Sequence, residues 1–299
     1  MFELSVDTIC PGYDFKVSGV SYAGAPKNNT VMYTTKKVEH LLESLTSVSE
    51  SLVFVETGSI IPEGITEKNA IFLTDNPQYE YARFVDKIAE QRKEEEKSIK
   101  YIFTDGGYYV SETAVIGENS YIEPGCIIGH GVKIGKNATI LAGSVIKHAI
   151  IGDDFFCNEK AVIGSYSFTM ADDNKGNKYR IPAMGKVIIG NNVEVGANNN
   201  IACGSTSDTI IDDYVKLDAL IHIGHDVHLR KNVRITAGVT VAGFVDAGEK
   251  AYFGVGANIR NRINIGKNTV IGMGAVVTKG FDDDVTVVGN PAKVLRTNK

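Results

Sequence analysis

The sequence has 299 residues, with 36 acidic and 31 basic side chains, a formal net charge of -5 and 43% apolar residues. This is an ordinary globular composition, and an acidic chain without a basic tail gives no electrostatic reason to bind nucleic acid or an anionic membrane. No apolar run approaches the roughly 18 residues that a membrane span needs. The first residues lack the basic and apolar segments of a secretory signal, so we expect a cytoplasmic protein.

The first part of the chain has the pattern of a small α/β domain. Residues 38–45, VEHLLESL, have the apolar spacing of a helix, and SLVFVET and NAIFLTDN read as short buried strands. Residues 79–100 are charge-dense and free of glycine and proline, as in an exposed helix. We therefore predict an α/β domain over residues 1–88 and a helical linker over residues 89–108.

Cysteine and glycine are distributed very differently. Cys10, Cys126, Cys157 and Cys203 lie far apart without CxxC spacing, which predicts buried free thiols and not a disulfide framework or a zinc ribbon. Only five of the 31 glycines precede Gly106, so the rest of the chain is unusually rich in this residue.

A six-residue repeat dominates the chain after the linker. Every sixth residue from Ile116 to Ile146 is isoleucine, and every sixth residue from Ile211 to Val277 is apolar. The position four residues after each anchor is small or β-branched in nearly every repeat. A hexad with one inward anchor, one small inward residue and a turn suits one face of a three-sided parallel β-coil, so three hexads form an 18-residue coil. Residues 18 apart are then stacked about 4.8 Å from one another.

The repeat is interrupted by two insertions, which in a solenoid leave the core as loops and often build a binding surface. The longer covers residues 164–186 and the shorter covers residues 204–209. We predict a mainly β fold, with the β-helix over residues 109–280 and a C-terminal tail over residues 281–299.

Several motifs around the insertions resemble the UDP-3-O-acylglucosamine N-acyltransferases, which are hexapeptide-repeat acyltransferases. They are VIG at residues 162–164, the insertion end KYRIPAMGKVIIG, NNVEVGAN, and DTIIDDYVKLDALIHIGHDVHL. The resemblance covers most of the chain. It implies a left-handed β-helix, a homotrimer, and acyl transfer at grooves between subunits.

The same resemblance implies a catalytic set. The family's catalytic histidine matches His225, and its carboxylate partner matches Asp218. A histidine accepts the proton of an amine that attacks a thioester, and a carboxylate orients the imidazole. One coil after His225 lies Gly243, which also matches the amide that binds the tetrahedral oxyanion.

Two neighbouring histidines raise the alternative of a metal site. His222 and His228 occupy the same phase of successive hexads on different faces, whereas His225 is out of phase with both. Three ligands placed in this way do not readily converge on one ion, so we predict no metal. We expect His222 and His228 to be turn or intersubunit residues.

The C-terminal motifs IGMGAVVTKGF and VTVVGNPAKVL resemble those of coenzyme A-dependent sugar acetyltransferases. In that group the GNPAK motif closes the last coil beside the cofactor. The alternative is that Gly-Asn-Pro is only a turn that ends the solenoid. The resemblance assigns coenzyme A contacts to Ala257, Ala275, Lys279, Asn290, Pro291 and Lys293.

The acceptor region departs from the lipid A enzymes. The insertion reads SYSFTM where that family has a DGFGF-like signature, and we predict that Phe168, Tyr179 and Arg180 bind the sugar and its phosphates. The alternative is a loop that protects the subunit boundary. The N-terminal motifs GVSYAGAP and TDNPQYEYARF resemble the family's uridine-binding domain, but its aromatic, asparagine and tyrosine positions are occupied by Met32, Thr35 and Val38, which removes the stacking on uracil.

The leading prediction is a homotrimeric acyltransferase that moves an acetyl or other short acyl group from acyl-CoA to the amine of a nucleotide-linked amino sugar, with His225 as general base. The main alternative is a UDP-3-O-acylglucosamine N-acyltransferase of lipid A synthesis, for which acyl carrier protein is the donor partner. A sugar O-acetyltransferase and a non-enzymatic β-helix scaffold are further alternatives, although a scaffold has no need of His225, Asp218 and Gly243.

Overall fold

The computed structural model describes residues 3–298, which divide into two compact units. Unit 1 comprises residues 3–98, Phe168–Met184 and Ser205–Ser207. Unit 2 comprises Ile99–Ser167, Gly185–Gly204 and residues 208–298. None of the helices within residues 3–298 is long and apolar enough to cross a membrane.

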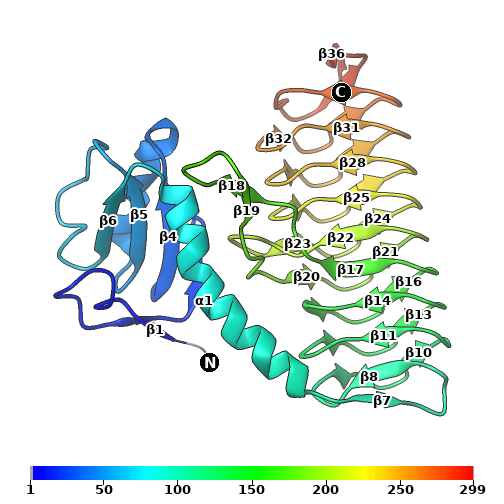
Figure 1. The fold of residues 1–299 in the computed structure, drawn as a ribbon. Coiled ribbons are helices and arrows are strands. Elements are labelled where there is room, and N and C mark those ends of the chain that lie inside the picture. The colour runs from blue at the N-terminus through cyan, green and yellow to red at the C-terminus, as the bar shows by residue number, and fades with distance from the viewer. Residues whose placement is uncertain (1–2, 299) are drawn as a thin grey trace. The chain divides into compact units, whose positions relative to one another are not determined.

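Unit 1 is an α/β unit built on a four-stranded parallel sheet (Figure 1). Its strands are, in spatial order, β3 (Gly19–Val20), β4 (Thr30–Thr34), β5 (Leu52–Glu56) and β6 (Ala70–Thr74). Outside this sheet lie the antiparallel pair β1 (Leu4–Ser5) and β2 (Lys16–Val17), the 3₁₀ helix η1 (Lys36–Ser47) and the long helix α1 (Pro77–Ser98).

Alternation along β5 gives the sheet two apolar faces. Leu52 and Phe54 pack in a core with Tyr81 and Val85 of α1, whereas Val53 and Val55 pack in a second core that contains Leu42 and Leu45 of η1. Successive side chains of a strand point to opposite faces, so one short apolar strand supplies both cores.

Part of the long insertion belongs to unit 1. Residues Met170–Asp172 (β18) and Lys178–Arg180 (β19) form an antiparallel hairpin. Ala171 and Ile181 are buried in the same core as Phe54 and Tyr81. The insertion was predicted as a surface loop, but its apolar residues complete a core built by the first 98 residues.

Unit 2 is a parallel β-helix whose coils have three faces (Figure 1). Face 1 contains, in spatial order, β9 (Val115–Ile116), β12 (Lys133–Ile134), β15 (Ala149–Ile151), β20 (Val187–Ile189), β23 (Thr209–Ile211), β26 (His228–Leu229), β29 (Asp246–Ala247) and β32 (Asn264–Ile265). Face 2 contains β10 (Tyr121–Ile122), β13 (Thr139–Ile140), β16 (Phe156–Cys157), β21 (Glu194–Val195), β24 (Lys216–Leu217), β27 (Arg234–Ile235), β30 (Tyr252–Phe253), β33 (Val270–Ile271), β35 (Val285–Val288) and β36 (Lys293–Thr297). Face 3 contains β7 (Tyr101–Phe103), β8 (Tyr109–Ser111), β11 (Ile127–Ile128), β14 (Val145–Ile146), β17 (Val162–Ser165), β22 (Asn200–Ala202), β25 (His222–Ile223), β28 (Thr240–Val241), β31 (Asn258–Ile259) and β34 (Val276–Val277).

The two inward positions of the hexad explain the core of unit 2. Every anchor from Ile122 to Ile146 and from Ile211 to Val277 is buried, and so are the small residues four positions later, such as Cys126, Ala138 and Val239. Cys157 and Cys203 are also buried thiols, and burial raises the pKa of Cys157 to about 12. The predicted β-coil is therefore confirmed by the burial pattern.

The turn between the two inward positions has a left-handed backbone. The residue before the small inward residue has a positive φ in coil after coil, for example Asn137 at 58° and Gly143 at 73°. Glycine and asparagine adopt this conformation at low cost, which explains their frequency in this phase of the repeat.

The strand register confirms the 18-residue coil and locates its interruptions. Tyr121 pairs with Thr139 and His222 with Thr240, each 18 residues later. Lys133 instead pairs with Ile150, so one residue is missing from the turn that contains His148. Ile150 pairs with Ile188, and Ile188 pairs with Ile210. Each insertion therefore makes the sequence spacing between paired residues longer than 18.

The observed boundaries differ from the predicted ones at two places. The first is the predicted junction at residue 88, which falls inside α1. The part of the helix that contributes buried residues to unit 1, the last of them Ile88, and the charged part beyond it form one continuous helix. The second is the predicted tail, which forms β35 and β36; β35 pairs with β33 and β36 pairs with β35, so both strands continue face 2.

We expect the interior of the coil to be intolerant of cavities. Ile140 is fully buried, so Ile140→Ala should lower the free energy of unfolding by about 2–5 kcal/mol. Val115 is 58% exposed, and Val115→Ala should change it by less than about 0.5 kcal/mol. Chemical denaturation of both variants tests this, and equal losses would contradict the assigned inward phase.

Candidate active site

One corner of the coil carries both insertions and the predicted catalytic histidine. This corner, here called the 3–1 corner, is formed by the turns that lead from face 3 to face 1, such as residues 224–226, 242–244 and 260–262. The long insertion follows β17 and the short one follows β22, both strands of face 3. The turn of His225 comes in the next coil, after β25.

His225 is bonded to the carboxylate of the residue that follows it. Its Nδ1 lies 2.7 Å from Oδ2 of Asp226, whose side chain is fully buried. The Asp226 backbone N–H donates to Oγ1 of Thr209 at 3.0 Å, which fixes the turn. Because a carboxylate only accepts, the proton of this bond is on Nδ1, and in the neutral imidazole the lone pair is then on Nε2.

Gly243 lies directly against the imidazole, as the 18-residue period predicts. A Cβ atom built on Gly243 would lie 2.7 Å from both Cε1 and Nε2 of His225. No larger residue fits at this position while the imidazole stays in place. Gly243 is buried, and its N–H donates no hydrogen bond within residues 3–298. One imidazole edge and one unused backbone donor therefore occupy the same small region of the 3–1 corner.

Asp218 lies at a different corner from His225. It follows β24 of face 2, it is exposed, and its Oδ1 accepts from the Ala219 N–H at 2.7 Å. The carboxylate that contacts His225 in this chain is Asp226 and not the predicted Asp218. His225 and Asp226 are adjacent in the sequence, and this adjacency could have indicated the pair, whereas the family motif pointed to Asp218.

The other two histidines have separate partners on two faces. Nδ2 of Asn200 lies 3.1 Å from Nδ1 of His222 on face 3, and Nε2 of His228 lies 3.1 Å from Oδ2 of Asp212 on face 1. Desolvation of the imidazole, followed by repulsion from the nearby His225, lowers the pKa of His222. Within the described residues, no group of three His, Cys, Asp or Glu side chains is arranged to hold a metal ion.

The residues predicted to contact coenzyme A do not form one cluster of side chains. Ala257 and Ala275 are fully buried, because they occupy the small inward position of the hexad. Their methyl groups therefore cannot contact a cofactor. Asn290 and Pro291 are exposed in the turn between β35 and β36, and Lys293 is the exposed first residue of β36. Nζ of Lys279 lies 5.9 Å from the centre of the Phe281 ring.

The GNPAK turn closes the last coil by backbone hydrogen bonds. Val276 donates to the Gly289 carbonyl at 3.0 Å, and Ala292 donates to the Val276 carbonyl at 2.8 Å. These bonds join the turn to β34. The structure thus gives the motif a structural role that is independent of any cofactor.

The predicted acceptor residues of the insertion have unlike environments. Phe168 is 79% exposed, and the Arg180 guanidinium lies 5.4 Å from the centre of its ring. Tyr179 instead packs against the core of unit 1, where its hydroxyl donates to Oδ2 of Asp86 at 2.6 Å. Burial and the bond to Asp86 raise the pKa of Tyr179 to about 12. Phe168 and Arg180 therefore remain candidates for ligand contact, whereas Tyr179 ties the hairpin to α1.

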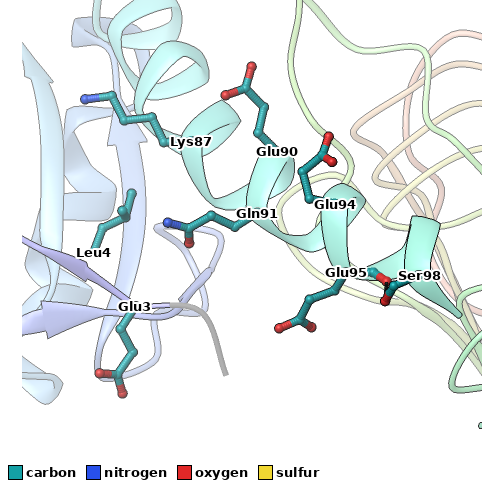
Figure 2. Close-up of a pocket in the computed structure, with 8 residues that line it drawn as sticks. All are labelled: Glu3, Leu4, Lys87, Glu90, Gln91, Glu94, Glu95 and Ser98. Atoms are coloured by element: carbon teal, nitrogen blue, oxygen red, sulfur yellow. Dashed lines mark hydrogen bonds between the residues drawn. The ribbon is translucent and has the colours of Figure 1, made fainter.

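One hollow of unit 1 is acidic and does not suit a nucleotide. This hollow of about 1100 Å³ runs along α1 and is lined by Glu3, Leu4, Lys87, Glu90, Gln91, Glu94, Glu95 and Ser98 (Figure 2). Four carboxylates against one ammonium disfavour phosphate. Met32, one of the three positions compared with the uracil site, is fully buried in the core on the η1 side of the sheet.

Comparison with known proteins first identifies the class of fold. The family model described as bacterial transferase hexapeptide (six repeats) matches residues 113–148. Among solved structures, a UDP-N-acetylglucosamine acyltransferase from Campylobacter jejuni gives a TM-score of 0.58 at 24% identity, covering 64% of this chain and 73% of that one. A UDP-N-acetylglucosamine acyltransferase from Bacteroides fragilis gives a TM-score of 0.54 at 22% identity, covering 65% and 74%. These matches confirm the predicted hexapeptide-repeat, left-handed β-helix fold.

The curated relatives show which hexapeptide-repeat acyltransferases the chain resembles. UDP-3-O-acylglucosamine N-acyltransferase 2 of Legionella pneumophila strain Lens is 44% identical over 103 residues, which are 34% of this chain and 30% of that protein. UDP-3-O-acylglucosamine N-acyltransferase of Coxiella burnetii is 36% identical over 193 residues, covering 56% of each chain. The chain thus resembles the hexapeptide-repeat acyltransferases of this name, as its motifs predicted. The matched part is less than two thirds of the length of these relatives.

We expect Tyr179 to act in stability. Tyr179→Phe should lower the free energy of unfolding by about 1 kcal/mol, since it removes the bond to Asp86. The folded-state pKa is raised above 10, so this contribution is present below pH 10 and is lost as the pH rises through about 12. Thermal unfolding of both proteins from pH 7 to pH 12 measures it. Phe168→Ala, at an exposed position, is the control and should leave stability unchanged; equal effects of the two substitutions would contradict the assignment.

Proposed function

We propose that this protein is an acyltransferase that moves an acyl group from a thioester to the amine of a nucleotide-linked amino sugar. The observation that carries the proposal is the set formed by His225, the buried Asp226 on its Nδ1, and Gly243, which lies against the imidazole and whose amide donates no hydrogen bond within residues 3–298. The names of the curated relatives supply the acceptor class. They favour a UDP-3-O-acylglucosamine type of acceptor, which was the alternative prediction from the sequence, over a simple acetyl transfer.

The proposed reaction uses each member of the set once. The amine nitrogen attacks the thioester carbonyl carbon while Nε2 of His225 takes the amine proton. Asp226 keeps Nδ1 protonated and stabilises the imidazolium that forms. The carbonyl oxygen becomes an oxyanion that the Gly243 N–H binds. When the intermediate collapses, the carbon–sulfur bond breaks and the imidazolium returns its proton to the departing thiolate, so an amide and a thiol are released.

The acceptor is proposed to meet the exposed pair Phe168 and Arg180 of the insertion. An aromatic ring covers the apolar face of a sugar, and a guanidinium binds phosphate oxygens through two parallel hydrogen bonds. We further propose a homotrimer, because hexapeptide-repeat acyltransferases typically assemble in this way. Asp218 keeps its predicted catalytic role only if such an assembly brings it to a histidine.

The carboxylate assignment gives a direct test of the proposal. His225→Ala should lower kcat by about 10²–10⁴-fold, because it removes the general base. Asp226→Asn should lower kcat substantially, since an amide no longer selects the Nδ1 protonated tautomer. Asp218→Asn tests the other carboxylate, and if Asp226 is the partner of His225 this variant should stay within about three-fold of the parent enzyme.

The assay for these variants is acyl transfer to UDP-3-O-acylglucosamine, followed by mass spectrometry of the amide product. Circular dichroism shows whether each variant keeps the β-helix. Parent-level turnover in His225→Ala would remove His225 from the mechanism. A larger loss in Asp218→Asn than in Asp226→Asn would restore the partner predicted from the sequence.

The donor defines two candidate functions. The relatives favour a lipid A type enzyme, for which we propose an acylated carrier protein, whereas the exposed Lys293 and Lys279 at the C-terminal coils favour acyl-CoA. The two donors share a phosphopantetheine arm, so the enzyme can distinguish them only by the nucleotide of coenzyme A or by the surface of the carrier protein.

We expect acylated carrier protein to give the higher kcat/KM. If acyl-CoA is instead the natural donor, Lys293→Ala should raise its KM several-fold, because a point charge for a phosphate is lost. Steady-state rates with both donors, with Lys250→Ala as a surface control, decide the matter. A higher kcat/KM with acetyl-CoA than with the acylated carrier protein would reverse the ranking.

A further inference from the structure

Three side chains are stacked above one another at the 3–1 corner. Asp226, Phe244 and Arg262 are 18 residues apart and have φ values of 57°, 59° and 59°. The stack is fixed by backbone bonds, since Phe244 N–H donates to the His225 carbonyl at 3.0 Å and Arg262 N–H donates to the Gly243 carbonyl at 3.1 Å. The catalytic turn is therefore followed directly by an aromatic residue and then by a cation.

The side chains of this stack contact His225 in sequence. The His225 and Phe244 ring centres are 5.4 Å apart, with the ring planes at 90°. The Arg262 guanidinium carbon lies 4.0 Å from the centre of the Phe244 ring. Both contacts have favourable geometry, because aromatic rings prefer an edge-to-face arrangement and a cation prefers the ring face.

Arg262 is held by this ring and not by an acidic partner. Its guanidinium forms no ion pair with a carboxylate in the part of the chain that the structure describes. The left-handed backbone adds strain at Phe244 and Arg262, as it does at Tyr214, Leu220 and Lys250 of the other two corners, whereas Gly238, Gly256 and Gly274 adopt it without strain. A bulky residue with positive φ costs free energy and is retained where its side chain is needed.

We propose that Phe244 and Arg262 are positioning residues that hold the His225 imidazole over Gly243. Phe244 restricts rotation of the imidazole by its edge-to-face contact, and Arg262 fixes the phenyl ring from its face. The inference rests on the proposed function of His225 as general base. It predicts that loss of the pair lowers kcat and leaves acceptor binding intact.

Glycine substitutions test this with little harm to the backbone. Phe244→Gly and Arg262→Gly relieve the left-handed strain, yet we expect kcat to fall about 10–100-fold in the first and about 3–10-fold in the second, because a misplaced base loses rate steeply. The acceptor KM should stay within two-fold. Phe244→Tyr and Arg262→Lys keep a ring and a cation, so they should recover most of the rate.

Lys250→Gly is the matched control, because Lys250 has a φ of 60° at another corner of the coil. It should leave kcat within two-fold of the parent enzyme. Equal losses in Lys250→Gly and Phe244→Gly would show a general effect of glycine on the coil and overturn the proposal, as would an unchanged kcat in Phe244→Gly.

A second readout does not depend on turnover. With ¹³C-labelled histidine, the ring Hε1 proton of His225 should show a nuclear Overhauser effect to Hα of Gly243, because Cε1 lies against that glycine. We expect this effect to weaken in Phe244→Gly and Arg262→Gly and to persist in Lys250→Gly. If the parent protein transfers no acyl group, the proposed function fails while this measurement still decides the positioning role. An effect of full strength in Phe244→Gly would refute that role.

Discussion

The interior of the three-sided coil is the constraint on which the rest of unit 2 depends. Each face supplies one anchor and one small residue to a space only a few side chains wide, so the apolar residues must recur every six positions and the strands must pair coil on coil. Because the stacking is obligatory, a residue in a turn lies against the residue one coil later. The contact of His225 with Gly243 and the stack of Asp226, Phe244 and Arg262 are consequences of this geometry.

The same constraint explains where chemistry is placed. The inward positions are committed to packing, which is why Ala257 and Ala275 are buried and offer no side chain to a ligand. The turns are free to vary, and the 3–1 corner uses this freedom for a buried carboxylate, an imidazole and an unused amide. Both insertions leave the coil at this corner as well. A rigid solenoid thus holds its reactive groups on the least constrained part of each coil.

Unit 1 is stabilised by two apolar cores, one on each face of its sheet, and not by a repeat. Its parallel sheet has apolar residues on both faces, and the hairpin of the insertion adds Ala171 and Ile181 to the core beside α1. The hydrogen bond from Tyr179 to Asp86 fixes the hairpin to that helix. A segment that reads as a polar loop is therefore part of the folded core of a unit that begins more than 160 residues earlier in the chain.

The sequence by itself determined the coil, its 18-residue period and the position of Gly243 over His225, because a short repeat leaves only one way to bury its apolar residues. It also determined the class of acyltransferase that the chain resembles, through motifs around the insertions. Only the tertiary structure decided that Asp226 and not Asp218 contacts His225, that Phe244 and Arg262 complete the stack, and that Tyr179 belongs to a core. These contacts depend on the direction of individual side chains at the corners and on packing between distant segments, and a repeat pattern carries information about neither.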